Sequence, residues 1–374
     1  MDVELAVEQI EAELAQVIGD HRRTQWRAHV SGGLPPLPPP ELVSRALAAR
    51  LAQLLPQAMG GAVRRRLVML TRAARRARID ADPKVSRIVG RIAAAAAAPS
   101  AGALAALARA RNRAAGGSFA ALLLADEELG GLREPSAAAQ GATAAPAGDR
   151  RLPEPAAVRD YLARRGLDPG PVLVTAAATA RCLAIDPPRE VAISMEPGTG
   201  DAAIRRLVHE LGHLRAARVR DAAAPWPLAD APTRGIAEGV AEWFADSADS
   251  AGFGREVLGL SAADAGERAR ARAAVRLPRG ARRVARGHRE LALYASPDTA
   301  EGLADPDRTS MALDPGAAVA YAAAESVRTA LEQAPGPLDA LAPAAAAALT
   351  TLAATGAAIS REEWLGRVAA AGSL

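Results

Sequence analysis

DAAIRRLVHELGHLRAARVR, residues 201–220, places His209, Glu210 and His213 at H-E-x-x-H spacing within a helical pattern. Side chains four residues apart lie on one face of a helix, so both imidazoles reach a single metal ion, and Glu210 lies within reach of a metal-bound water. The chain contains only 5 histidines, and two of them belong to this motif. The segment therefore predicts a zinc centre on a helix.

A second helical segment, RGIAEGVAEWFADS at residues 234–247, supplies the further ligand that such a centre needs. A hydrolytic zinc site has three protein ligands and an open fourth position. Glu238 follows His213 by 25 residues, and Glu242 lies one helical turn further on the same face. We assign Glu238 to the metal and Glu242 to a hydrogen bond that holds a ligand imidazole. The reverse order, and a solvated surface position for Glu242, are the alternatives.

The composition predicts a mainly α fold. Alanine makes up about a quarter of the 374 residues and aromatic residues only 3%, so the helices must pack closely on small side chains. We expect helices at 155–166 and 171–184, and a short extended segment, EVAISM at 190–195, next to the zinc-binding helix. As an edge strand, this segment would pair with the backbone of a peptide substrate.

Two segments that are unfavourable for helix suggest how the chain is divided. A Pro-rich break, GGLPPLPPP at 32–40, ends the first helical stretch, and an Ala, Gly and Pro cluster at 136–150 predicts a connection. We expect an N-terminal helical region at 1–135 and a helical catalytic region at 151–374. The N-terminal region acts either as a lid over the cleft or as an independent partner-binding module.

The charge balance indicates no nucleic-acid partner. Lys and Arg total 46 against 42 Asp and Glu, a formal net charge of +4, and nearly all of the cations are arginines spread along the chain. Seven arginines interleave with apolar residues at 64–80. We expect a solvated basic face on a core helix there, with contact to an anionic surface as the alternative.

Cysteine usage and hydropathy predict a cytoplasmic protein. The single cysteine, Cys182, excludes an intramolecular disulfide framework. The N-terminal residues lack the basic and apolar regions of a secretory signal. Two uncharged stretches, 92–108 and 340–359, are mostly Ala with Pro and Gly inside them. We expect them to be packed helices and not membrane spans.

With these motifs, the sequence resembles the gluzincin metallopeptidases, and more narrowly the thimet oligopeptidase and oligoendopeptidase family. In that family an HExxH helix is followed at similar spacing by a ligand Glu on a second helix, matched here by Glu238. An R-N-x-x-A helix followed by Gly and an aromatic residue is matched within residues 107–119, at Arg111, Asn112, Ala115, Gly117 and Phe119. The resemblance implies a helical metallopeptidase fold with Zn²⁺ as cofactor.

The family also has a Gly-rich loop and a tyrosine-bearing helix that close over the substrate. The segment DPGAAVAYAAAESVRTAL, residues 314–331, resembles it, with Gly316 and Tyr321 at matching places. Tyr321 is our first candidate to donate a hydrogen bond to the tetrahedral oxyanion, and His288 is the second.

These patterns together predict a zinc-dependent metallopeptidase that hydrolyses peptide bonds in short peptides. Glu210 would activate the zinc-bound water and pass its proton to the leaving amine. One alternative is a regulatory HExxH protease that cleaves a specific protein partner. The other is a helical scaffold that retains zinc without turnover. We expect a peptide substrate and no membrane partner.

Overall fold

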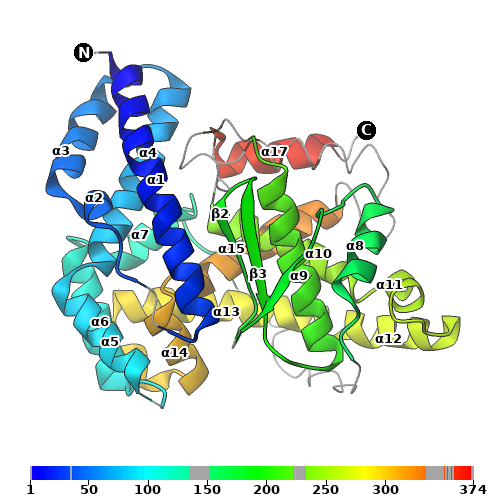
Figure 1. The fold of residues 1–374 in the computed structure, drawn as a ribbon. Coiled ribbons are helices and arrows are strands. Elements are labelled where there is room, and N and C mark those ends of the chain that lie inside the picture. The colour runs from blue at the N-terminus through cyan, green and yellow to red at the C-terminus, as the bar shows by residue number, and fades with distance from the viewer. Residues whose placement is uncertain are drawn as a thin grey trace.

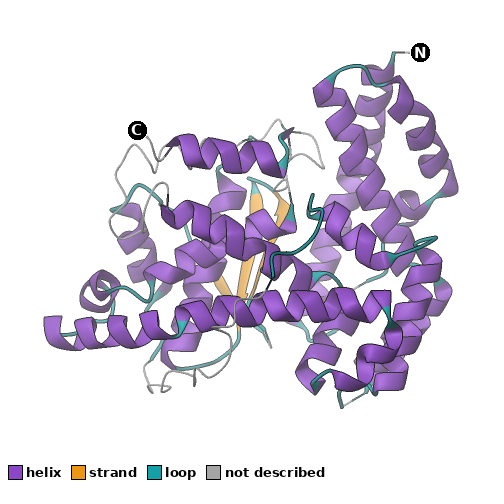
Figure 2. Ribbon diagram, turned by 180° about the vertical axis from the view of Figure 1, so that it is seen from behind, coloured by secondary structure: helices purple, strands orange, loops and turns teal. Residues whose placement is uncertain are grey.

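The computed structural model describes residues 2–33, 36–95, 97–134, 151–177, 179–221, 224, 233–333, 349, 352, 355 and 358–371. The predicted mainly α fold with a short β element is confirmed (Figures 1 and 2). The N-terminal helices are α1 (Val3–Val30), α2 (Pro40–Val43), α3 (Arg45–Leu54), α4 (Gly61–Asp80), α5 (Pro83–Ala94), α6 (Ala101–Ala114) and α7 (Phe119–Asp126). The later helices are α8 (Pro155–Ala163), α9 (Gly200–Arg218), α10 (Arg234–Ser247), α11 (Ala251–Glu256), α12 (Ala262–Ala274), α13 (Arg276–Ala295), α14 (Asp305–Leu313), α15 (Ala317–Gln333) and α17 (Arg361–Ala371).

Local capping explains where several of these helices begin. The Asp2 carboxylate accepts the first free N–H groups of α1, and Asp82 does the same for α5, where Pro83 occupies the first turn. Ser100 caps α6 through the N–H of Ala103. These caps satisfy backbone donors that a helix start otherwise leaves unpaired.

The β element is a three-stranded sheet with the order β1-β3-β2. Its strands are β1 (Val174–Ala176), β2 (Arg181–Asp186) and β3 (Glu190–Met195). β1 pairs parallel to β3, and β2 pairs antiparallel to it. The predicted strand at 190–195 is confirmed, whereas the predicted helix at 171–184 is wrong. Val174 and Thr175 are β-branched, and their pairing with β3 outweighs the helix preference of the following alanines.

Three apolar cores hold the described residues together. One lies among α1 to α4, another surrounds α9 and α10, and the third joins α5, α6 and α7 to α13, α14 and α15. In this third core, Phe119 packs edge-on against Tyr294, with ring centroids 4.7 Å apart. Residues of both regions that the sequence predicts, 1–135 and 151–374, therefore share a core. The predicted connection at 136–150 lies outside the described residues.

The N-terminal helices also contact the sheet. Figure 1 shows the C-terminal half of α1 beside β2. The Arg22 guanidinium donates to the Ala184 carbonyl oxygen at 3.0 Å, and the His29 ring lies 2.7 Å from the Ser194 hydroxyl. These contacts join the N-terminal helices to the sheet.

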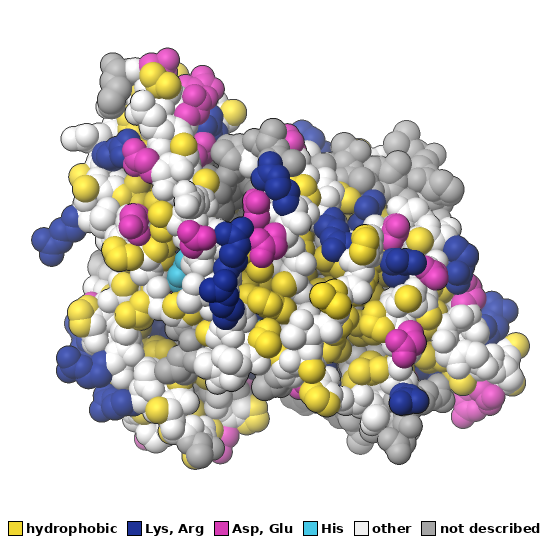
Figure 3. All heavy atoms as spheres, viewed as in Figure 1, with side chains coloured by type: hydrophobic (Ala, Val, Ile, Leu, Met, Phe, Trp, Pro, Cys, Tyr) yellow, Lys and Arg dark blue, Asp and Glu magenta, His cyan; other side chains and the backbone are white. Residues whose placement is uncertain are grey.

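Several arginines of α4 contact other elements of the protein, whereas the sequence predicts a solvated basic face. Arg66 donates to Glu11 on α1, Arg65 and Arg72 pair with Glu128, and Arg76 donates to the Pro315 carbonyl oxygen. On the face shown in Figure 3, cationic and anionic side chains are interspersed, and neither sign gathers in an extended area.

Among the described residues, no helix has both the length and the apolar character needed to cross a bilayer. The stretch 92–108 is divided between α5 and α6. Most of 340–359 lies outside the described residues.

We predict that proteolytic cleavage within 136–150 leaves the two fragments associated. The third core buries apolar surface from both sides of the cut, and this surface would be exposed on separation. Gel filtration of the cleaved protein should give the elution volume of the intact chain, and urea should separate the fragments. Separation in native buffer would contradict the shared core.

Candidate active site

Helices α9 and α10 carry the predicted metal-binding residues and pack directly against each other. A Cβ atom added at Gly212 would lie 2.9 Å from the Ala241 Cα atom, which is closer than real Cβ atoms come to backbone. The glycine inside the HExxH motif therefore allows α10 to approach α9 closely enough for Glu238 to reach the two imidazoles. The prediction that small side chains set the helix packing is confirmed here.

His209, His213 and Glu238 converge on one point. Their Nε2, Nε2 and Oε2 atoms are separated by 3.1 Å between the two histidines, 3.3 Å from His209 to Glu238, and 3.5 Å from His213 to Glu238. A tetrahedral ion with bonds of about 2.0–2.1 Å separates its ligand atoms by about 3.3 Å. The three atoms therefore have the spacing of ligands to one ion.

The burial of this group supports the same reading. Glu238 is buried, and its Oε2 atom has no hydrogen-bond partner among the described residues. Burial acts to lower the pKa of His209, but Glu238 and Glu242 outweigh it and raise that pKa to about 10. A cation is thus favoured between these side chains, and the donor set of two imidazoles and one carboxylate fits a divalent metal of the zinc type.

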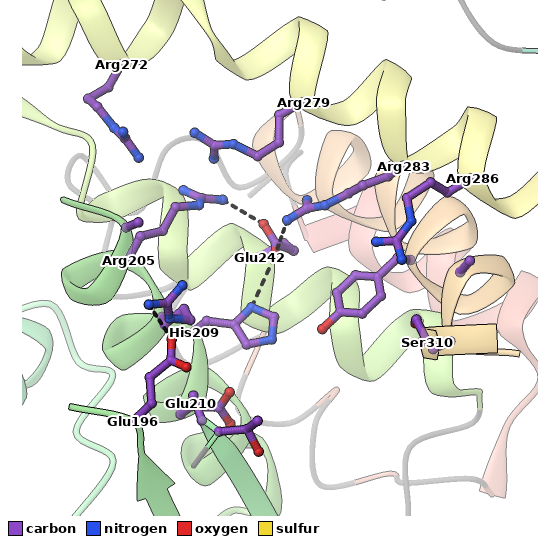
Figure 4. A pocket seen from close by; sticks show the side chains of 17 residues that line it. Glu196, Arg205, His209, Glu210, Glu242, Arg272, Arg279, Arg283, Arg286 and Ser310 are labelled. Carbon is purple, nitrogen blue, oxygen red and sulfur yellow. Dashed lines mark hydrogen bonds and ion pairs between the residues drawn. The ribbon is translucent and has the colours of Figure 1, made fainter. Parts of the chain in front are cut away.

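Glu242 lies behind His209 and is held by two guanidinium groups. Its Oε1 atom lies 3.1 Å from His209 Nδ1, and Arg205 and Arg283 each approach the carboxylate to 2.6 Å (Figure 4). Burial opposes ionisation, but Arg283, His209 and Arg205 hold the Glu242 pKa well below its usual range. An ionised Glu242 beside Nδ1 favours a proton on that nitrogen, which is the arrangement that would leave Nε2 available to a metal ion.

Glu210 is buried on the side of α9 that faces the sheet. Its carboxylate lies close to the backbone N–H of Cys182 on the edge strand β2. Burial raises the pKa of this carboxyl group, which makes it a stronger proton acceptor. The expectation that EVAISM forms the edge strand is wrong, because β3 is paired on both sides and β2 lies at the edge beside Glu210.

Tyr321 reaches the same site from α15. Its ring stacks on the His209 imidazole at a centroid distance of 6.4 Å, and its hydroxyl lies close to the Glu238 carboxylate. Burial, together with the charges of Glu238 and Glu242, raises the pKa of the phenol well above its usual value. The hydroxyl therefore stays protonated and can donate a hydrogen bond.

The loop before α15 is held by a residue that sequence reasoning missed. The buried Glu290 carboxylate accepts the N–H of Gly316 at 2.7 Å and that of Val319 at 3.2 Å. Gly316 has φ of +85°, a conformation that other residues rarely adopt, and this turn directs α15 toward the site. No spacing pattern links residue 290 to 316, so the contact had no signal in the sequence.

His288 does not join this group. Its Nε2 atom hydrogen-bonds with the Arg133 carbonyl oxygen at 2.9 Å, and the residue does not line the cavity beside the site. On α13 it lies off the face that carries Arg279, Arg283 and Arg286 toward the cavity. We therefore give it no role in the reaction.

Arg111 and Asn112, which carried part of the family resemblance, hold helices together. Arg111 is buried and donates to the Tyr294 hydroxyl and to the carbonyl oxygens of Met311 and Ala312. Asn112 donates to the Tyr294 carbonyl oxygen and accepts the Phe119 N–H. These bonds attach α6 to the segment that precedes the tyrosine-bearing helix.

A cavity of about 590 Å³ opens beside His209, Glu210 and Tyr321. Six of its lining side chains are guanidinium groups: Arg205, Arg206, Arg272, Arg279, Arg283 and Arg286. Figure 4 shows those of α12 and α13 along one wall above His209. Sequence reasoning missed this wall, although positions 279, 283 and 286 have the i, i+4, i+7 spacing of one helix face. Arginine is too common elsewhere in the chain for that spacing to attract notice.

Comparison with known proteins supports the fold. No protein-family model matches the sequence, and no curated protein matches it significantly. Among solved structures, the M32 carboxypeptidase from Deinococcus radiodurans has a TM-score of 0.63 and 14% identity, over 99% of this chain and 96% of that one. Metallocarboxypeptidase 1 from Trypanosoma cruzi has a TM-score of 0.59 and 12% identity, with the same coverage. The chain has the fold of these helical metallopeptidases, as the resemblance implied.

We predict unequal effects of the two buried glutamates on metal binding. Glu238→Ala removes a ligand atom and should lower zinc affinity by more than about 1,000-fold. Glu242→Ala removes only the partner of His209 Nδ1 and should lower it by about 10–100-fold. Competition titration with a chromophoric chelator measures both. The opposite ranking would exchange the two roles.

Gly212→Ala should destabilise the protein by about 1–3 kcal/mol, because the new methyl group forces α9 and α10 apart. Gly90→Ala is the matched control, since that helical glycine has open space around it, and it should be neutral or stabilising. Urea unfolding measures both changes. Equal stability of the two variants would show that the close contact at Gly212 is unimportant.

Proposed function

We propose that this protein is a zinc-dependent metallopeptidase that removes C-terminal residues from short peptides. The observation that carries the proposal is the convergence of the His209, His213 and Glu238 ligand atoms beside the buried Glu210 carboxylate. Those three side chains would hold the ion. When bound, zinc supplies Lewis acidity that polarises the scissile carbonyl and brings the pKa of water near neutrality.

Glu210 serves as the general base and then as the general acid. Its carboxylate takes a proton from the attacking water and delivers it to the nitrogen of the leaving residue. The backbone N–H of Cys182 lies close to this carboxylate, and the raised pKa of Glu210 suits a group that must accept and release a proton in one cycle.

Tyr321 stabilises the developing oxyanion. Its neutral hydroxyl donates a hydrogen bond without bringing a positive charge next to the metal ligands in the ground state. The Glu290 carboxylate fixes the loop before α15 and thereby holds the phenol ready before the substrate arrives.

Two observations favour an exopeptidase acting at the C-terminus. The cavity beside the site is of a size that accepts a few residues, and guanidinium groups line it. A terminal carboxylate is the charged group that all C-terminal substrates share, and arginine binds it well. The structural neighbours from Deinococcus radiodurans and Trypanosoma cruzi bear the name carboxypeptidase.

The test compares wild type with Glu210→Gln on N-blocked tripeptides with a free or an amidated C-terminus. We expect one zinc per chain in both proteins, cleavage of the free-carboxylate peptides by wild type, and a loss of about 100–10,000-fold in the variant. Glu267→Gln, which changes an exposed carboxylate on α12, serves as the control and should retain activity.

Three results would each oppose a part of the proposal. Retained activity in Glu210→Gln would remove Glu210 as the base. Equal cleavage of amidated peptides would indicate an endopeptidase. Zinc binding without cleavage of any peptide would favour the scaffold alternative or a protease for one protein partner.

A further inference from the structure

The guanidinium groups around the cavity outnumber the carboxylates that neutralise them. In one connected group of ion pairs, six arginines share five carboxylates among the described residues. The arginines are Arg205, Arg272, Arg276, Arg279, Arg283 and Arg328, and the acids are Glu242, Asp246, Asp249, Glu325 and Glu332. In a second group, Arg286 and Arg289 share Asp307. In these two ion-pair groups, which line or adjoin the cavity, the arginines therefore outnumber their carboxylate partners by two.

The first of these charges belongs to Arg279. Its nearest carboxylate, Asp249, is 3.6 Å away and is already bound by Arg205 at 2.9 Å and Arg272 at 2.8 Å. The Arg279 Nη1 atom is buried without a hydrogen-bond partner. Burial and the neighbouring cations Arg205 and Arg283 lower its pKa to about 10. Among the described residues, no carboxylate is left to neutralise this guanidinium group.

The second charge belongs to the pair of Arg286 and Arg289. Asp307 lies 2.6 Å from Arg286 and 3.0 Å from Arg289, so one carboxylate serves two cations. Arg286 lines the cavity, next to Ser310 in Figure 4, whereas Arg289 does not.

The helix fixes the spacing of the two backbone positions that carry the unmatched cations. Positions 279 and 286 lie two turns apart on the same face of α13, a rise of about 10.5 Å. In a C-terminal glutamate, four carbon–carbon bonds separate the two carboxylate carbons, which spans about 5 Å when extended. A charge-assisted contact of about 2.8 Å at each end extends this reach to about 10 Å.

We infer that the cavity selects peptides whose C-terminal residue is acidic, with Arg286 binding the terminal carboxylate and Arg279 the side-chain carboxylate. The inference rests on the proposed carboxypeptidase function and names its substrate class. The side-chain carboxylate is assigned to Arg279 because that end of the cavity holds four guanidinium groups, Arg205, Arg272, Arg279 and Arg283 (Figure 4). A terminal carboxylate alone would leave the charge at this end unmatched.

The first experiment measures kcat/KM of wild type on two blocked tripeptides that differ only in a C-terminal Glu or Gln. We expect the Glu peptide to be favoured by about 10-fold or more, because the two side chains have the same shape and differ in charge. Equal rates, or a preference for Gln, would overturn the inference while leaving the carboxypeptidase function intact.

The second experiment uses Arg279→Gln, with Arg270→Gln, an exposed arginine of α12, as the control. The Glu-to-Gln ratio should fall toward 1 in Arg279→Gln and stay at its wild-type value in the control. An equal loss on both peptides would assign Arg279 to the terminal carboxylate and overturn the inference. If Arg279→Gln does not fold, the Glu-to-Gln ratio of the wild-type protein in the first experiment still decides the inference.

The third experiment is independent of turnover. Calorimetry on the metal-free protein should show glutarate binding about 10-fold more tightly than butyrate, with the difference lost in Arg279→Gln. Equal affinity for the two acids would overturn the two-carboxylate site. If no peptide is cleaved but glutarate binds as expected, the proposed activity fails while the anion site remains.

Discussion

The close contact between α9 and α10 is the constraint on which the site depends. Gly212 leaves no side chain between the two helix backbones, so a glutamate on α10 can share an ion with two histidines on α9. A similar contact occurs at Gly239, where an added Cβ atom would lie 2.5 Å from Val327 on α15. Glycines thus allow three helices to pack closely, and the proposed metal ligands and Tyr321 lie where these helices meet.

Close packing of small residues leaves the polar groups between these helices with little access to water. Ion pairs between neighbouring helices compensate these buried polar groups. Glu242 lies at their centre and contacts Arg205, His209 and Arg283. A buried carboxylate between two guanidinium groups is costly to break from either side, because removal of one partner leaves an unmatched charge. The same network therefore orients His209 and resists rearrangement of the helices that carry it.

What the sequence could reveal depended on distance along the chain. His209, Glu210 and His213 lie within one helical turn, and Glu238 and Glu242 within another, so helical spacing alone predicts which of them can face the same point. The pairing of β1 with β3 joins segments about 20 residues apart, and local preference for helix misled the prediction there. The guanidinium wall, the Glu290 contact and the edge position of β2 depend on how distant elements meet, which no local pattern encodes.

The family resemblance and the local motifs also differed in what they could predict. Tyr321 was identified only through a loop that resembles the gluzincin one, and the structure brings it against His209. His288 rested on its residue type alone, and the structure points it toward Arg133. A series of residues that matched a family motif therefore predicted proximity to His209 better than the chemical type of a single residue did.

The bonds of Arg76 and Arg111 to the segment before α15 also affect the order of synthesis. These arginines leave the ribosome early, whereas their partners at Met311, Ala312 and Pro315 follow 200 to 239 residues later. Contacts over such long separations form late in folding. A nascent chain that already contains His209 and His213 therefore still lacks the contacts that hold the segment before α15, the helix that carries Tyr321. The proposed site is therefore complete only after residues 311–315 have been synthesised and have packed against Arg76 and Arg111.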